Sequence, residues 1–338
     1  MDTTTASATT SASLAASRVI LDIRGLTTSF ATAEGVAQAV DTASLTLEQG
    51  ETLALVGESG CGKSVLGLSV LGLVPDPPGR VTAGQALFDG RDLLALSERE
   101  LQDIRGRRIA MIFQEPMTSL NPVLRIGEQI AETLRRHFGA SRAEAAERAV
   151  QALARVGIPD PAAHARSYPH QLSGGMRQRV MIAMAISCSP EVIIADEPTT
   201  ALDVTIQAQI LELLMELREQ AGSSGLLITH DLGVVARISR RVAVMYAGRI
   251  VEEGPVRGLF REPLHPYTRG LLGSLPVPGR RGGLTPIPGI VPSIYHLPTG
   301  CRFHPRCPDA MDICRATEPE HLDLGDGRRV RCWLHAAR

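Results

Sequence analysis

The sequence carries a glycine-rich segment of the kind that holds phosphate groups. Residues 57–64 are Gly-Glu-Ser-Gly-Cys-Gly-Lys-Ser, which fits the pattern G-x-x-x-x-G-K-[ST]. An apolar run at 53–56 precedes this segment, and apolar residues with helical periodicity follow it to about Leu73, so we expect a loop between a strand and a helix. Backbone N–H groups of such a loop point at phosphate oxygens. Lys63 would then contact the β and γ phosphates of ATP, and the Ser64 hydroxyl would bind Mg²⁺.

Lys63 is the only lysine in a chain whose other basic residues are arginine. A compact ammonium on a flexible stem fits inside a curled loop, whereas a planar guanidinium does not. The alternative, a glycine-rich turn that matches the pattern by chance, is disfavoured by the flanking strand and helix. We expect nucleotide contacts along the whole loop, from Gly57, Glu58, Ser59, Gly60, Cys61, Gly62, Lys63, Ser64 and Val65.

Two acidic residues follow a second apolar run, at 192–195. A carboxylate at the carboxyl end of a strand is well placed to orient the ligands of Mg²⁺, and we assign this role to Asp196. Glu197 is expected to polarise the attacking water as general base. The alternative is an ordinary buried strand that ends in two solvated acids.

Residues 172–176, Leu-Ser-Gly-Gly-Met, resemble the signature segment of ABC-transporter ATPases. Ser173, Gly174 and Gly175 open a helix and would offer N–H groups to phosphate. The resemblance implies that this segment completes the site of a second ATPase subunit, a paralogue or a copy, in a head-to-tail dimer. A simple Ser-Gly-Gly helix cap is the alternative.

The resemblance to ABC ATPases extends to four further positions. Gln114, after an apolar run at 109–113, is similar to the glutamine that senses Mg²⁺ and water and links hydrolysis to the membrane domains. Residues 201–203, Ala-Leu-Asp, resemble the loop that communicates across the dimer through Asp203. His230 resembles the switch histidine at the γ phosphate. Phe30 is the candidate for stacking on adenine, with core packing as its alternative.

The pattern along the chain predicts an α/β fold of the P-loop NTPase type. Strands at 19–23 and 40–47 suggest an N-terminal antiparallel β subdomain, and the runs at 192–195, 226–229 and 242–246 suggest a parallel, doubly wound sheet. A helical subdomain is expected at about 115–187, and prolines after about residue 254 suggest an irregular C-terminal extension. We expect a disordered tail at 1–17, an ABC ATPase domain at 18–258 and the extension at 259–338.

Charge and hydropathy exclude several classes of protein. The 338 residues include 35 basic and 36 acidic side chains, so there is no basic field of the kind that attracts nucleic acid, and we expect no such partner. No apolar run approaches the roughly 18 to 20 residues that span a bilayer. The N-terminal residues lack the basic start and apolar block of a signal peptide, and we therefore expect a cytosolic protein.

The C-terminal part suggests a subfamily. His265-Pro-Tyr-Thr, residues 288–293 and 300–308, and residues 115–122 resemble the ATPases of oligopeptide and dipeptide importers. The resemblance implies a peripheral subunit at the cytoplasmic face of the inner membrane, with two transmembrane permease subunits and an extracytoplasmic peptide-binding protein as partners. The alternatives are an importer ATPase for nickel or another small solute, a soluble ABC ATPase without a membrane partner, and a binding module that has lost catalysis.

Four of the six cysteines lie in the extension with the spacing C-x₅-C-x₆-C-x₁₇-C, namely Cys301, Cys307, Cys314 and Cys332. Four thiolates can hold a [4Fe–4S] cluster, and the resemblance to importer subunits that carry one supports it. Zinc is the alternative, although structural zinc sites use closer cysteine pairs, with His304 or His335 as possible substitutes. Cys61 and Cys188 are expected to be free thiols.

Overall fold

The computed structural model describes residues 18–200, 203–275 and 286–336. The tail expected at 1–17 and the residues at 201 and 202 lie outside this range. Within it, the strands form two sheets. The first is antiparallel, in the order β2-β1-β4-β5, with the bounds β2 Gly35–Glu48, β1 Val19–Thr32, β4 Gly79–Phe88 and β5 Arg91–Asp92.

The N-terminal hairpin of β1 and β2 is longer than the strands expected at 19–23 and 40–47. The added part of β1 includes Thr27, Thr28 and Ser29, which are polar but buried. The Thr28 hydroxyl lies 2.7 Å from the Ser69 hydroxyl, and such a pairing makes the burial of both groups tolerable. An apolar pattern cannot reveal strand residues of this kind.

The second sheet runs in the order β11-β12-β10-β9-β3-β8-β7-β6. From β6 to β9 the neighbouring strands are parallel, as expected for a doubly wound sheet, and β10, β12 and β11 add antiparallel strands at one edge. The bounds are β11 Leu322–Asp323, β12 Arg329–Val330, β10 Arg249–Pro255, β9 Arg241–Tyr246, β3 Thr52–Val56, β8 Ser224–Ile228, β7 Val192–Asp196 and β6 Ile109–Ile112.

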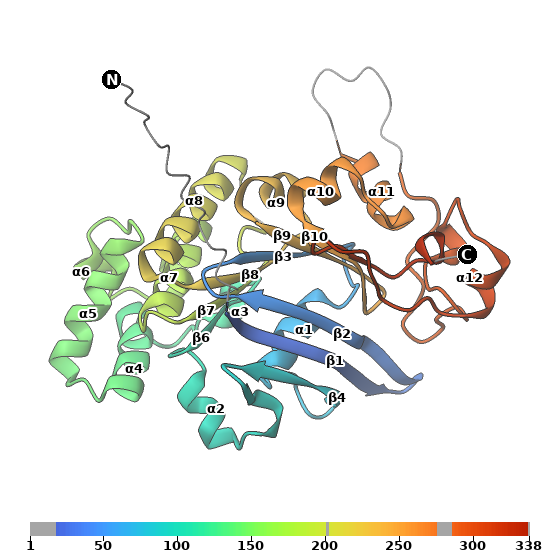
Figure 1. The fold of residues 1–338 in the computed structure, drawn as a ribbon. Helices are drawn as coiled ribbons and strands as arrows, with labels where there is room; N and C mark the ends of the chain where they lie inside the picture. Colours follow the sequence, from blue (N-terminus) through green and yellow to red (C-terminus); the bar gives the residue numbers. More distant parts are fainter. Residues whose placement is uncertain (1–17, 201–202, 276–285, 337–338) are drawn as a thin grey trace, which may run out of the picture.

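Helices cover these sheets and fill the segment at about 115–187 where a helical subdomain was expected. In Figure 1, α4, α5 and α6 lie at one end of the molecule and α12 at the other, with the sheets between them. The α-helices are α1 Lys63–Val70, α2 Glu98–Ile104, α3 Pro116–Ser119, α4 Ile126–Phe138, α5 Arg142–Arg155, α6 Pro161–His164, α7 Gly174–Ile186, α8 Val204–Ala221, α9 Leu232–Ile238, α10 Val256–Arg261, α11 Pro266–Gly273 and α12 Asp312–Ala316. Short 3₁₀ turns lie at Leu93–Ala95, Pro169–Gln171, His304–Arg306 and Trp333–His335.

The C-terminal extension joins the core instead of lying apart from it. Its strand β12 pairs with β10 through Val330 and Arg329, which extends the large sheet. Phe303 and Tyr267 are buried against Tyr246 of β9, with ring centroids 5.2 Å and 4.6 Å from that of Tyr246. Residues 286–303 of the described chain form no helix or strand, as the prolines suggested.

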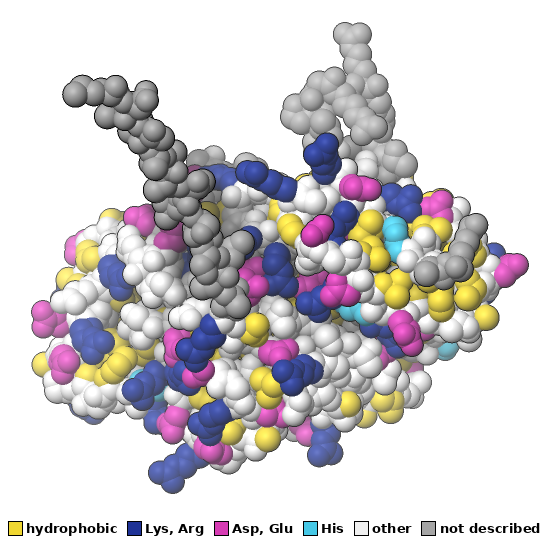
Figure 2. Space-filling model, in the orientation of Figure 1, with side chains coloured by type: hydrophobic (Ala, Val, Ile, Leu, Met, Phe, Trp, Pro, Cys, Tyr) yellow, Lys and Arg dark blue, Asp and Glu magenta, His cyan; other side chains and the backbone are white. Residues whose placement is uncertain are grey.

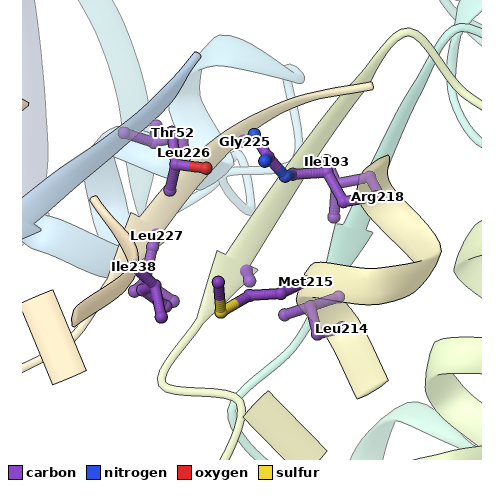
Figure 3. Close-up of a pocket in the computed structure, with 10 residues that line it drawn as sticks. Thr52, Ile193, Leu214, Met215, Arg218, Gly225, Leu226, Leu227 and Ile238 are labelled. Carbon is purple, nitrogen blue, oxygen red and sulfur yellow. The ribbon is translucent and has the colours of Figure 1, made fainter. Parts of the chain in front are cut away.

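A small apolar cavity of about 30 Å³ lies where α8 and α9 cover the parallel sheet (Figure 3). Leu214 and Met215 of α8 face Leu227 of β8 and Ile238 of α9 there. Thr52, which opens β3, also lines the cavity, so the cavity lies at the end of the strand opposite to the glycine-rich loop. It is a small, partly open pocket, with room for about one water molecule.

The surface in Figure 2 carries basic and acidic side chains interspersed over the same face, in keeping with the net charge of −1. In the described part of the chain, none of the helices combines the length and the apolar character needed to cross a bilayer.

His265 makes the stability of the extension depend on pH. Its Nδ1 accepts the N–H of Tyr267 at 3.0 Å, and burial lowers its pKa from 6.5 to about 3. The folded state therefore stays unprotonated at His265 between about pH 6.5 and 3, whereas the unfolded state takes up a proton there. The contribution of His265 to the free energy of unfolding is therefore fully present above pH 6.5 and decreases as the pH is lowered towards 3.

We predict that His265→Asn flattens this dependence. An asparagine oxygen can still accept the Tyr267 N–H, but it does not titrate. The free energy of unfolding, measured by urea denaturation from pH 4 to 6, should fall less steeply in the variant, by about 1 kcal/mol per pH unit at most. Parallel curves for the two proteins would contradict the assignment.

Candidate nucleotide site

The glycine-rich loop connects β3 to α1, as the sequence predicts. Gly62 precedes the first residue of α1 with φ +107°, and a Cβ there would lie 2.2 Å from the Ala39 carbonyl oxygen of β2. A Cβ on Gly57 would lie 2.2 Å from the carbonyl oxygen of Met245 in β9. The loop therefore passes between two strands with no room for a side chain at either glycine.

Lys63 lies inside the curl of this loop. Its side chain is buried, and Nζ donates to the carbonyl oxygens of Gly57 at 2.9 Å and Glu58 at 3.0 Å. A buried ammonium needs such acceptors, and the curled backbone provides them. The positive charge of Lys63 is thus held at the first turn of α1, beside a cavity.

This cavity has a volume of about 350 Å³. It opens along the loop and the start of α1, where backbone N–H groups and the positive end of a helix favour an anion. Its lining combines the loop with aromatic and aliphatic side chains and with two polar residues from the carboxyl ends of β6 and β7: Phe30, Ala39, Ser59, Gly60, Gly62, Lys63, Ser64, Val65, Gln114, Glu197 and Ile294.

Of the two acidic residues, Glu197 lines this cavity, and Asp196 contacts Ser64, which also lines it. Ser64 Oγ donates to Asp196 Oδ1 at 3.0 Å, so the hydroxyl and the carboxylate expected to bind Mg²⁺ are adjacent. Burial raises the pKa of Asp196, and the Ser64 hydrogen bond only partly opposes this effect. A divalent cation beside this carboxylate would favour its charged form.

Glu197 is at the centre of a hydrogen-bonded group. Its Oε2 accepts from Gln114 Nε2 at 3.1 Å and from Thr200 Oγ1 at 2.8 Å, and its Oε1 lies 3.2 Å from His230 Nδ1. Burial pushes the pKa of Glu197 upwards, but the contacts with Thr200 and His230 outweigh it and bring the pKa below its ordinary value. The carboxylate is therefore charged at neutral pH. Its backbone has φ +43°, an unusual value for a side-chain-bearing residue.

The signature residues lie outside this cavity. Ser173 caps α7 by accepting the N–H of Met176 at 3.3 Å, and Ser173 and Gly174 are exposed. Gly175 lies close to Ile206 of α8, and Asp203 caps α8 by accepting the N–H of Ile206 at 3.0 Å. The residues at these two helix N-termini therefore do not line the cavity beside Lys63.

The sequence of this chain matches a known protein family. Residues 40–200 match the family described as ABC transporter, and residues 251–314 match the one described as oligopeptide/dipeptide transporter, C-terminal region. The dipeptide transport ATP-binding protein DppD of Bacillus subtilis is 51% identical over 94% of this chain and 96% of its own length. The chain belongs to the ABC transporter ATPase family.

Other relatives agree with this membership. A probable peptide ABC transporter ATP-binding protein of Sinorhizobium fredii is 52% identical over 93% of this chain and 95% of its own length. Among solved structures, a dimeric ATP-binding cassette in a post-hydrolysis state, bound to ADP and Pi, is 30% identical. It covers 70% of this chain and 99% of its own, with a TM-score of 0.63. The fold expected from the sequence, an ABC ATPase core, is confirmed.

Several residues that contact this ABC ATPase site could not be predicted from the sequence. The Tyr267 hydroxyl accepts the backbone N–H of Glu58 at 2.8 Å, and Arg306 pairs with the Glu58 carboxylate at 2.7 and 3.0 Å. Ile294 also comes from the extension and lines the cavity. The sequence marked the stretches around Tyr267 and Arg306 as similar to a subfamily, but it held no signal that they reach the phosphate loop.

The four cysteines of the extension do not form a ligand group. Across the described ranges, the structure has no cluster of three or more His, Cys, Asp or Glu side chains able to hold a metal ion. The expected [4Fe–4S] cluster therefore has no support from this geometry. The thiols do share one region, since the Cys301 N–H donates to the Cys314 carbonyl at 2.8 Å. Burial raises the pKa of Cys301 to about 12, with smaller contributions from Glu318, Cys314 and Cys332. Without a metal, such a thiol stays protonated at neutral pH.

The phosphate loop allows a sharp test of its packing. Gly62→Ala should destabilise the protein by about 2 to 4 kcal/mol, because the new Cβ would lie 2.2 Å from backbone and the positive φ is unfavourable. Gly60→Ala is the matched control: Gly60 also has positive φ, but no atom lies within 4 Å of the added Cβ. This control should lose only about 1 kcal/mol. Urea denaturation measures both, and equal losses would contradict the packing argument.

Proposed function

We propose that this chain hydrolyses ATP to energise the import of peptides, either dipeptides or oligopeptides, through a membrane ABC transporter. The observation that carries the substrate class is the match of residues 251–314 to the oligopeptide/dipeptide transporter C-terminal region. The names of relatives that align over nearly the whole chain support it. We also propose the division into an ATPase domain at 18–258 and an extension at 259–338.

Binding of ATP is assigned to the cavity beside the loop. The N–H groups of loop residues that line the cavity, at Ser59, Gly60 and Gly62, and the Lys63 ammonium would hold the phosphates, because they are donors at the positive end of α1. Phe30, which lines the same cavity, would stack on adenine. Ser64, Asp196 and Gln114 would hold Mg²⁺, which neutralises charge on the phosphates.

Hydrolysis is assigned to Glu197 as general base. Its charged carboxylate can accept a proton from water, and its contacts with Gln114, Thr200 and His230 orient it. His230 would also contact the γ phosphate, so that it links the base to the bound nucleotide. Gln114 touches Glu197 and would carry changes at the site to the membrane subunits.

The proposed active form is a head-to-tail dimer of ATPase subunits. Ser173, Gly174 and Gly175 are accessible at the start of α7, do not line the cavity of their own chain, and would bind the phosphates held by the partner. Asp203, the cap of α8, would contact the partner near this site. The further partners are two permease subunits and an extracytoplasmic peptide-binding protein, at the cytoplasmic face of the inner membrane.

Reconstitution tests this function. The chain, co-purified from membranes with its associated subunits and placed in vesicles, should take up peptides only with MgATP. Glu197→Gln should still bind ATP but lose turnover by about 100-fold or more, since the amide cannot act as a base. Glu191→Gln is the control, because Glu191 pairs with Arg108 on the surface and should leave turnover unchanged. Full hydrolysis by Glu197→Gln would refute the base assignment, and transport of nickel instead of peptides would refute the substrate class.

A [4Fe–4S] cluster at Cys301, Cys307, Cys314 and Cys332 remains a separate proposal, with zinc as its alternative. Four thiol donors in one region support it by residue type alone. Protein purified without oxygen should contain about four iron atoms per chain and absorb broadly near 400 nm. Cys301→Ser should lower the iron content, whereas Cys188→Ser, at a buried thiol on α7's carboxyl side, should not. Stoichiometric zinc, or no metal, would contradict the cluster.

A further inference from the structure

Glu58 of the phosphate loop has all its polar groups occupied. Its N–H donates to the Tyr267 hydroxyl at 2.8 Å, and its carbonyl accepts from Lys63 Nζ at 3.0 Å. Its carboxylate receives two hydrogen bonds from Arg306, at 2.7 and 3.0 Å. The Gly57–Glu58 peptide unit therefore joins the two parts of the chain: its carbonyl oxygen accepts from Lys63 Nζ at 2.9 Å, and its N–H is held by Tyr267 of the C-terminal extension.

Arg306 links the phosphate loop to the C-terminal extension by hydrogen bonds to both. Its side chain is only 5% exposed, and Nε donates to the Pro288 carbonyl at 2.8 Å while both terminal nitrogens engage Glu58. Pro288 lies six residues before Ile294, which lines the nucleotide cavity. One guanidinium thus fixes both the phosphate loop and a wall of the nucleotide cavity. A lysine could not make this set of contacts, because it lacks the planar fork.

Tyr267 is equally constrained. Its ring is fully buried between Tyr246 and Phe303, with centroids 4.6 Å and 5.4 Å away. The packed ring can place its hydroxyl in only one position, which is at the Glu58 N–H. The loop N–H is thereby occupied by the protein and is unavailable to phosphate.

We propose that Arg306 and Tyr267 are positioning residues for the nucleotide site and act on Lys63 through Glu58. The extension would then set the affinity for nucleotide, in addition to any role in subunit contacts. This inference rests on the proposed binding of ATP at the loop. The competing view is that both residues only stabilise the extension, in which case nucleotide affinity of the folded protein would not depend on them.

The test uses the full chain and measures its affinity for MgADP and for a non-hydrolysable ATP analogue with Mg²⁺. Arg306→Gln should weaken nucleotide binding about tenfold, because the bidentate pair with Glu58 is lost. The affinity of Arg306→Lys should lie between those of the parent chain and of Arg306→Gln. Glu58→Gln with Arg306→Gln should bind no more weakly than Arg306→Gln alone, since the two residues act as one unit. Arg269→Gln is the control: it breaks an ion pair within the extension, with Asp309 at 3.0 Å, and should leave affinity unchanged.

Thermal midpoints without nucleotide separate positioning from folding. If Arg306→Gln lowers the midpoint but binds nucleotide like the parent well below it, the inference is overturned. If Arg306→Gln fails to fold, Tyr267→Phe and Glu58→Gln decide, because each removes one contact and little volume. Weaker binding by these two variants supports the inference, and parental affinity in both overturns it. A parent chain that binds no nucleotide, or a Lys63→Ala variant that binds as well as the parent, would instead refute the ATP site itself.

Discussion

The path of the phosphate loop between β2 and β9 is the constraint on which the rest of the site depends. Gly62 passes the Ala39 carbonyl and Gly57 passes the Met245 carbonyl, both closer than a side chain would allow. The loop can adopt this path only when the N-terminal hairpin and the large sheet are both in place. The carbonyl groups of Gly57 and Glu58 then accept from Lys63, and Ser59, Gly60 and Gly62 of the loop line the cavity.

Buried ion pairs join the two sheets along this line. Asp41 of β2 pairs with Arg249 of β10 at 2.9 Å and with Arg302 of the extension. Burial pushes the pKa of Asp41 upwards, but both arginines together bring it below its ordinary value. An isolated buried charge would be strongly unfavourable, so these partners must stay together in the folded state. They fix the hairpin, the sheet and the extension relative to one another, and therefore also the loop between them.

The groups proposed to bind Mg²⁺ and to catalyse hydrolysis are brought together by the order of the parallel strands. Asp196 is the last residue of β7, and Gln114 and His230 follow β6 and β8, its neighbours in the parallel sheet. Carboxyl ends of parallel strands meet at one edge, and this edge faces the loop. Glu197 occupies the centre of the group because its positive φ turns the chain immediately after β7. The parallel sheet thus positions the side chains proposed for catalysis, while the hairpin and the extension contact the phosphate loop.

Local patterns in the sequence determined the fold class, the phosphate loop and the strand-end groups, since each depends on residues within a few positions of one another. The apolar runs at 192–195 and 242–246 became β7 and β9 because their side chains are buried on both faces of the sheet. Tertiary structure alone decided the length of the hairpin, where Thr28 is buried by pairing with Ser69. It also decided the addition of β12 to the sheet.

The contacts of Glu58 show most clearly what local sequence patterns determine and what tertiary structure adds. Its place in the loop is visible in the sequence, but Tyr267 and Arg306 lie 209 and 248 residues further along the chain. The four cysteines are the opposite case, in which the sequence predicted a grouping that the structure does not contain. Their type and spacing suggested a set of metal ligands, and the described residues form no such cluster. Sequence determined which residues could do the chemistry, since that depends on residue type and local spacing. Tertiary structure decided what holds them, because packing brings together groups that no local pattern connects.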